Sequence, residues 1–329
     1  MNLRLLAWEI TRRCPLNCRH CRAAATDSPQ SGELSTAEAL AVIASLARLP
    51  TRPAVIFTGG EPMYRADLAD LIQATSASRL RPLLAPCGTL VTERKMATFK
   101  AAGLAACSFS LDGATPERHD AFRRVPGAWK AVHNALEVCR RLAIPFQINV
   151  TLSRLNLPDL ERFPDLAASL GATRLDLFFL VPAGRGKELA DLALDPRETL
   201  HALRRIETLR SHSPIPLKVT CAPQSAAIWS GGGYGCLAAR GFLFLSHTGQ
   251  LQPCGFLNLS GANVRDHALD LPAAFAASPA LLRLADRATL KAPCAQCPHR
   301  DSCGGCRARA YAIASDPFAG DPSCPIRNR

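Results

Sequence analysis

The chain has 329 residues, which fits one large domain or a large domain with a small one beside it. Hydrophobic residues make up 48% and charged residues 20%, as in packed globular proteins, and the longest apolar runs are far too short to span a membrane. The net charge is +12, but no basic run is interleaved with aromatic residues, so composition does not indicate nucleic-acid binding and leaves an anionic small-molecule substrate open.

The first 212 residues alternate between apolar runs typical of strands and amphipathic segments typical of helices. Capping signals support this pattern, because Ser35 and Glu38 have the spacing of a capping box, and Thr92 and Gly103 have the residue types that begin and end a helix. Strands are expected at 3–10, 54–60, 81–88, 106–113, 145–153 and 174–182. Helices are expected at 35–49, 66–77, 92–103, 127–143 and 157–170.

This order predicts an α/β fold, a partial (β/α)6 barrel of the TIM type over residues 1–212 with a parallel sheet. In such barrels the loops after the strands carry the chemistry. The loops expected on that face are 14–21, 59–62, 86–88, 112–113 and 184–187. From about residue 213 the helical periodicity fades and Gly, Pro and Cys become dense, so residues 213–329 are expected to form a small irregular domain that needs metal to fold.

The chain has fourteen cysteines, which are not expected to form disulfides in a cytoplasmic protein. The N-terminal ten residues lack the features of a signal peptide, which favours that cytoplasmic location. Two groups have metal-ligand spacing. The first is Cys14, Cys18 and Cys21, and the second is Cys221, Cys236, Cys254, Cys294, Cys297, Cys303, Cys306 and Cys324. Cys107 and Cys139 are expected to be small buried apolar residues, and the role of Cys87 is left open.

Three thiolates in one loop allow several metal sites. They could bind a catalytic zinc ion, or a zinc ion completed by His20, or a [4Fe–4S] cube with one iron left open. The segment TGGEP (58–62) decides between them. Together with the C-x₃-C-x₂-C loop after the first strand, it resembles the radical S-adenosylmethionine (SAM) superfamily, over about residues 3–210.

The resemblance implies roles for single residues. Cys14, Cys18 and Cys21 hold the cube, and SAM binds the fourth iron through its amino and carboxylate groups. Reduction of the cube cleaves SAM, and the resulting radical takes a hydrogen atom from the substrate. An external one-electron donor such as flavodoxin or ferredoxin would supply the electron. The implied cofactor-binding residues are Gly59, Gly60, Glu61, Pro62, Ser110, Asp112 and His20, with the glycines admitting the cofactor closely and Glu61 accepting from its ammonium group.

The C-terminal cysteines resemble the SPASM domain, which carries auxiliary Fe–S clusters. The resemblance implies one cluster on Cys294, Cys297, Cys303 and Cys324. A second cluster would lie on Cys254, Cys306 and Cys236. Two sites of four cysteines need eight, which favours Cys221 as the fourth ligand of this second cluster. A zinc ribbon on the two C-x₂-C pairs is the alternative, but it would leave four cysteines unexplained.

Several local strings, among them AWEITRRCPLNCRHCRAAA (7–25) and CGGCRARAYA (303–312), resemble the radical SAM haem synthases and their haem d1 maturase relatives. That family implies oxidative decarboxylation of tetrapyrrole propionates, with an auxiliary cluster as electron acceptor. Candidate partners for the propionates are Arg185, Lys187, Arg240, Arg307 and Arg309, although each by itself is expected to be a solvated surface residue, as is His247. The alternatives are a SPASM peptide maturase that crosslinks a ribosomal peptide, and a non-enzymatic Fe–S electron carrier.

Overall fold

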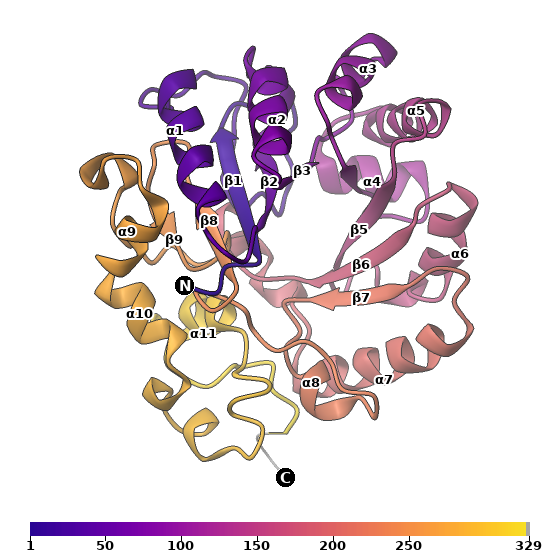
Figure 1. Ribbon diagram of the computed structural model, residues 1–329. Helices are drawn as coiled ribbons and strands as arrows, with labels where there is room; N and C mark the ends of the chain where they lie inside the picture. The colour runs from indigo at the N-terminus through magenta and orange to yellow at the C-terminus, as the bar shows by residue number, and fades with distance from the viewer. Residues whose placement is uncertain (327–329) are drawn as a thin grey trace.

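The computed structural model describes residues 1–326 and is built around one nine-stranded sheet with the order β7-β6-β5-β4-β3-β2-β1-β8-β9 (Figure 1). All neighbouring strands are parallel except β8 and β9. The expected α/β fold with a parallel sheet is therefore confirmed. The first six strands are β1 (Leu5–Thr11), β2 (Ala54–Gly59), β3 (Arg81–Leu84), β4 (Ala106–Ser110), β5 (Phe146–Leu152) and β6 (Arg174–Phe179).

Helices lie along the outer side of the curved sheet (Figure 1). The expected capping box is present, because Ser35 and Glu38 bond each other's backbone at the start of the first helix, and Thr92 caps the third. One short helix between β4 and β5, α4, was not expected from the sequence. The helices are α1 (Thr36–Ala47), α2 (Leu68–Ala77), α3 (Glu93–Ala101), α4 (Pro116–Arg123), α5 (Ala128–Arg141), α6 (Arg162–Ser169) and α7 (Pro196–His212).

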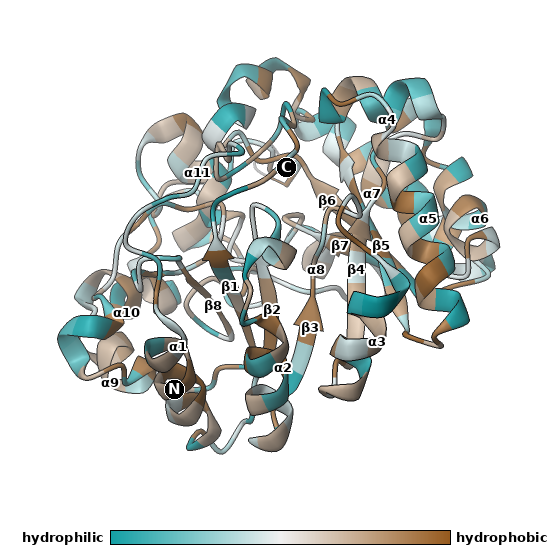
Figure 2. Ribbon diagram, turned by 90° about the horizontal axis from the view of Figure 1, so that it is seen from above, coloured by the Kyte–Doolittle hydropathy of each residue, from teal (hydrophilic) through white to brown (hydrophobic). Residues whose placement is uncertain are grey.

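The strands alternate between a face that packs on the helices and an inner face. In β5, residues 146, 148, 150 and 152 are buried while residues 147, 149 and 151 are half-buried. Because side chains in a strand point alternately to opposite faces, this pattern sends the polar side chains Asn149 and Thr151 to the inner side of the sheet. Ser108 and Ser110 of β4 follow the same alternation. Figure 2 shows the hydrophobic colour following the strands, while the outer helices carry mixed residues.

The sheet continues across the expected domain boundary between residues 212 and 213, because three of its strands lie after that point. β7 (Leu217–Thr220) adds to β6, and β8 (Phe242–Leu245) pairs with β1 in parallel, with Leu5 opposite Phe242. β9 (Leu251–Gln252) then pairs with β8. These segments are only two to four residues long, so they lack the run of alternating residues that predicts a strand.

The remainder of the C-terminal region is irregular, as expected. Its helices are short and are joined by loops (Figure 1), and its cysteines lie outside the α-helices. The helices are α8 (Ser225–Ile228), α9 (Leu271–Ala276), α10 (Pro279–Ala285) and α11 (Arg307–Ala314). No helix within residues 1–326 is both long enough and apolar enough to cross a membrane.

Candidate functional site

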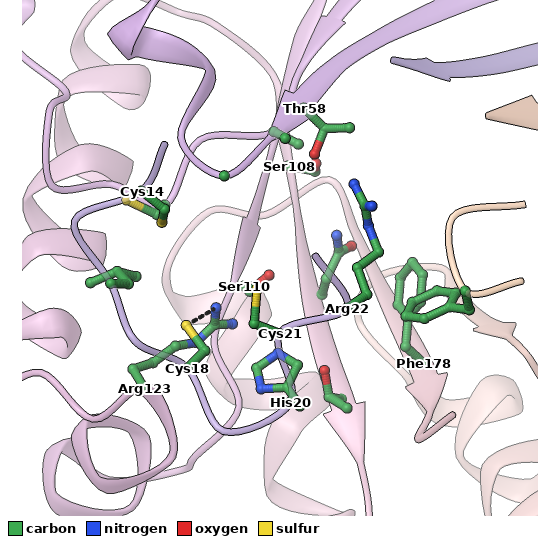
Figure 3. A pocket seen from close by; sticks show the side chains of 18 of the residues that line it. Cys14, Cys18, His20, Cys21, Arg22, Thr58, Ser108, Ser110, Arg123 and Phe178 are labelled. Carbon is green, nitrogen blue, oxygen red and sulfur yellow. Dashed lines mark hydrogen bonds between the residues drawn. The ribbon is translucent and has the colours of Figure 1, made fainter. Parts of the chain in front are cut away.

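A cavity of about 240 Å³ opens where the carboxyl ends of β1 to β6 meet (Figure 3). Its wall takes residues from the cysteine loop after β1, from the loops after β2 and β3, and from the inner faces of β4, β5 and β6. Phe256, from the C-terminal region, completes the wall. Polar lining residues on the strands are Thr58, Ser108, Ser110, Asn149 and Thr151.

All three cysteines of the N-terminal loop lie at this cavity, and Cys14 and Cys18 are each only 7% exposed. The Cys14 N–H donates to Thr26 O at 2.8 Å, and the Cys21 N–H donates to Cys18 O at 3.3 Å. These bonds shape the loop, and all three of its cysteines line the same cavity (Figure 3). Within residues 1–326, no three Cys, His, Asp or Glu side chains converge on one point as the ligands of a single ion would. Thiols that hold a cube bind separate iron atoms and need not converge.

Arg123 is a wall residue that sequence reasoning missed. Its Nη1 donates to Cys18 Sγ at 3.5 Å, and its Nη2 forms an ion pair with the buried carboxylate of Asp112. Burial raises the pKa of Cys18, and the Arg123 charge opposes this by favouring the thiolate. A guanidinium at this place therefore stabilises negative charge on one of the three thiols.

Asp112 does not line the cavity, although it was expected to contact the cofactor. Its Oδ1 accepts from the Thr151 N–H at 2.6 Å, and its Oδ2 accepts from Arg123. Burial alone would raise the pKa of Asp112, but the Arg123 charge, the neighbouring His20 and His119 and the Thr151 N–H together lower it to about 2. Asp112 thus acts through Arg123, while its neighbour Ser110 does line the cavity.

His20 lies in the cavity wall, with its ring stacked on Phe122 at 4.4 Å between centroids and 7° between planes. Burial lowers the pKa of His20 to about 4, so the ring is neutral at pH 7. Its Nδ1 is buried and has no hydrogen-bond partner among the described residues. A polar atom left in this state fits a cavity that takes a ligand with hydrogen-bonding groups.

The two glycines of the TGGEP segment line the cavity, but the closest approach at each is to the chain itself. A Cβ at Gly59 would lie 2.1 Å from Thr11 O, and one at Gly60 would lie 2.3 Å from Arg13 O. Both positions must be glycine so that the end of β2 can pass against the end of β1. At this contact the Gly60 N–H also donates a hydrogen bond to Thr11 O at 2.8 Å.

Glu61 is fully buried behind this wall. Its Oε1 accepts from the Met63 N–H at 2.9 Å, and its Oε2 accepts from the Cys87 N–H at 2.5 Å. Burial raises the pKa of Glu61 well above the usual range, and the nearby Cys87 adds to the effect. Glu61 is not among the residues that line the cavity. The expected contact of Glu61 with the ammonium group of the cofactor stays a prediction. Pro62, the next residue, is buried at the start of the 3-10 turn Pro62–Tyr64.

A buried network connects the cysteine loop to the C-terminal region. Glu9 of β1 is 2% exposed, accepts from His247 Nδ1 at 2.9 Å and pairs with Arg22 at 3.2 Å. Arg22 follows Cys21, lines the cavity and stacks over Phe244 of β8 at 4.3 Å. The expectation of a surface His247 is therefore wrong, because this residue is only 8% exposed and bonded to a buried carboxylate.

The C-terminal thiols gather into two neighbourhoods. In the first, Cys221 hydrogen-bonds Cys306, both lie near Cys254, and Cys254 lies near Cys236. The Cys221 thiol lowers the pKa of Cys306 to about 7. Cys221 also has a left-handed backbone, with φ of 59°, which is uncommon outside glycine.

The second neighbourhood holds Cys303 with Cys294 and Cys324 close by. Cys297 directly follows the 3-10 turn Cys294–Gln296, and its N–H donates to Cys294 O at 3.2 Å. The thiols of the two neighbourhoods match the division into two ligand sets expected from the sequence. Their assignment as cluster ligands remains a prediction.

Two arginines expected at the solvated surface are instead buried among these thiols. Arg309 is 3% exposed and forms a two-pronged ion pair with Asp321 at 2.8 and 2.9 Å. Arg307 is fully buried and donates to backbone carbonyls, including Pro317 O at 2.9 Å. Arg185 is half-buried and donates to Cys18 O at 3.0 Å, whereas Lys187 and Arg240 are exposed as expected.

Comparison with known proteins gives agreement over nearly the whole chain. Residues 8–167 match the model of the radical SAM superfamily. The AdoMet-dependent heme synthase of Oleidesulfovibrio alaskensis is 38% identical, over 99% of this chain and 88% of its own. The Fe-coproporphyrin III synthase of Methanosarcina barkeri is 30% identical (97% and 87%), and a PqqA peptide cyclase of Rhizobium meliloti is 29% identical (98% and 87%).

The fold also matches a solved structure. The crystal structure of native anSMEcpe with bound AdoMet superposes with a TM-score of 0.74 over 98% of this chain and 94% of that one. Sequence identity is only 16%, so this likeness concerns the fold. It covers the C-terminal region as well as the sheet.

Proposed function

The chain belongs to the radical SAM superfamily, and we propose that its reaction is the oxidative decarboxylation of propionate side chains on an iron-coproporphyrin, forming haem. The observation that carries this proposal is the 38% identity to an AdoMet-dependent heme synthase over 99% of the chain. That span includes both cysteine regions, so the likeness extends beyond the SAM-binding part. Because the chain belongs to a family of enzymes, the electron-carrier alternative falls away.

The residues of the cavity fit the cofactors of this family, a [4Fe–4S] cluster and SAM. When bound, the two supply an organic radical that removes one hydrogen atom from the substrate. Cys14, Cys18 and Cys21 offer the three thiolates, and Arg123 favours the charged form of Cys18. Ser110 and the neutral ring of His20 offer hydrogen-bonding groups and a stacking face to SAM.

The barrel supplies one side of the cavity, and Phe256 of the C-terminal region supplies part of the other. A wall of this kind shields part of a reactive site from water. Loss of CO₂ from a propionate that has lost one hydrogen atom leaves one further electron to be removed as the vinyl group forms. We assign the C-terminal thiols as ligands of the cluster that accepts this electron. We assign a cytoplasmic flavodoxin or ferredoxin as the external donor of the electron that starts the reaction.

The test is turnover of iron-coproporphyrin III by anaerobically reconstituted protein with SAM and dithionite, followed by mass spectrometry. The expected products are haem, CO₂ and 5′-deoxyadenosine. Cys14→Ala is expected to abolish 5′-deoxyadenosine, and Cys254→Ala to stop haem formation while some uncoupled SAM cleavage continues. Cys139→Ala, at a buried thiol remote from both groups, is the control that should retain activity.

Failure of this assay would point to the peptide alternative. If SAM is cleaved but iron-coproporphyrin III is never altered, and if a peptide is crosslinked instead, then the peptide-maturase assignment replaces the present one. Undiminished SAM cleavage in Cys14→Ala would contradict the assignment of the N-terminal cysteine loop.

A further inference from the structure

Arg287 is a buried cation with unused hydrogen-bond donors. It begins the 3-10 turn Arg287–Thr289 and is 5% exposed. Its Nη2 donates to the backbone oxygen of Cys236, but Nε and Nη1 are buried and have no partner among residues 1–326. Within the same described part of the chain, no carboxylate forms an ion pair with Arg287. A buried charge in this condition is costly unless an anion compensates it.

The charges around Arg287 increase the need for an anion. Arg240 and Arg307 are close enough to repel it, and the Cys236 thiol is the group that attracts it. Asp301 is also within range, but it is exposed and its carboxylate is paired with Arg300 at 3.0 Å. The one side from which compensation can come is therefore the thiol neighbourhood of Cys236.

The two glycines between Cys303 and Cys306 leave space for buried guanidinium groups, including that of Arg287. A Cβ at Gly304 would lie 2.2 Å from Arg287 Cζ, and Gly304 has a φ of +68°. Gly304 thus leaves room for the guanidinium of Arg287, and its positive φ independently favours glycine at this turn. The next glycine does the same for a second cation, since a Cβ at Gly305 would lie 2.4 Å from Arg307 Nη2.

The two guanidiniums serve different thiol neighbourhoods. Arg307 approaches Cys294 Sγ at 3.9 Å, whereas Arg287 lies beside Cys236. Arg309, the third buried arginine, is already neutralised by Asp321. Within the described part of the chain, each neighbourhood therefore has one buried guanidinium that forms no ion pair with a carboxylate. Four thiolates on a cluster core of charge +2 carry a net charge of −2, which is the kind of partner these cations lack.

We propose that Arg287 sets the reduction potential of the auxiliary cluster held by the Cys236 neighbourhood, by donating N–H···S hydrogen bonds and one positive charge to it. This inference rests on the proposed function, which requires that cluster to accept an electron. One-electron reduction makes the cluster one unit more negative, so an adjacent cation stabilises the reduced form and raises the potential. Arg287 is a positioning and charge-supplying residue and does not touch the substrate.

The experiment is an anaerobic redox titration of the reconstituted full-length protein, read by electron paramagnetic resonance, with iron content measured on each sample. Arg287→Gln removes the charge and most donors and should lower the midpoint potential of one auxiliary cluster. Arg287→Lys keeps the charge but loses the planar fork, so a smaller decrease is expected. Arg300→Gln removes an equal charge from an exposed pair in the same region and should leave the potential unchanged.

The outcomes separate this proposal from the proposed function. If Arg287→Gln retains wild-type iron and its potential does not move, the proposal is overturned while the cluster and its role stand. If Arg287→Gln loses the cluster but Arg287→Lys keeps it, the potential of Arg287→Lys decides: a decrease supports the proposal, and a wild-type potential overturns it. Loss in both variants overturns it, since Arg287 would then be a structural brace. A wild type without any auxiliary cluster contradicts the proposed function itself.

Discussion

Replacing Asp321 by Asn should destabilise the C-terminal region strongly. Asp321 is fully buried, and besides Arg309 it accepts from the Cys306 N–H at 2.7 Å and from Gln224 Nε2 at 2.7 Å. Burial raises the pKa of Asp321, but the Arg309 charge, the hydrogen bonds from Arg309 and the backbone N–H groups of Cys306 and Ser323 together keep that pKa below the usual range, so the pair is ionic at neutral pH. Removing one partner of a buried ion pair costs about 3–5 kcal/mol.

The size of this effect can be read from urea unfolding of the reconstituted protein, followed by circular dichroism and cluster absorbance. With a slope of about 3 kcal/mol/M, a loss of about 4 kcal/mol lowers the urea midpoint by about 1.3 M. Asp301→Asn is the matched control, because it removes a carboxylate from an exposed pair with Arg300 and should barely change the midpoint.

Two results would refute the reasoning. One is an Asp321→Asn midpoint no lower than that of Asp301→Asn. The other concerns the double variant Asp321→Asn/Arg309→Met, which removes both charges, keeps an oxygen that can accept from the Cys306 N–H and Gln224 Nε2, and should recover part of the loss. If the double variant is as unstable as the sum of the single ones, the pair itself is not what stabilises the region.

Three further predictions concern the barrel. Glu61→Gln should keep the cluster absorbance and weaken SAM binding about ten- to a hundred-fold in calorimetry, because a charge-assisted bond is worth about 1.5–3 kcal/mol; equal affinity would remove Glu61 from the site. The pKa of His20 is about 4 in the folded protein and about 6.5 in the unfolded chain, so at a pH between these two values the unfolded chain binds more protons. Lowering the pH from 7.5 to 5 should therefore destabilise wild type relative to His20→Phe by about 2 kcal/mol in urea unfolding, and a constant difference would contradict this. Gly60→Ala, which forces a Cβ against Arg13 O, should cost about 1–3 kcal/mol and reduce iron retention, whereas Gly231→Ala, with open space around it, should not.

The sequence was informative wherever structure is decided by near neighbours. Ser35 and Thr92 begin helices because their side chains bond the backbone three residues on, and those partners are visible in the sequence. The cysteine loop and the TGGEP segment were expected at one site for a comparably simple reason. Both follow parallel strands, and the ends of parallel strands lie on the same side of a sheet.

Residues with distant partners were missed or misjudged. His247 and Arg309 were expected at the surface because their residue types usually lie there, yet their carboxylate partners, Glu9 and Asp321, bury them. Arg123 was missed because α4 was missed, and that helix is short and largely polar. The strand β8 was missed since nothing in its four residues indicates that β1 is its neighbour.

The pairing of β8 with β1 affects how the protein can be made. During synthesis β1 emerges long before β8, so its second neighbour is present only once Phe242–Leu245 has left the ribosome. Until then β1 has one bare edge, and bare edges invite pairing with other chains. The cysteine loop after β1 also lacks Phe244 beneath Arg22 during that interval. Loading of the N-terminal cluster is therefore expected to follow completion of the chain, and a nascent chain halted before Phe242 should take up little iron.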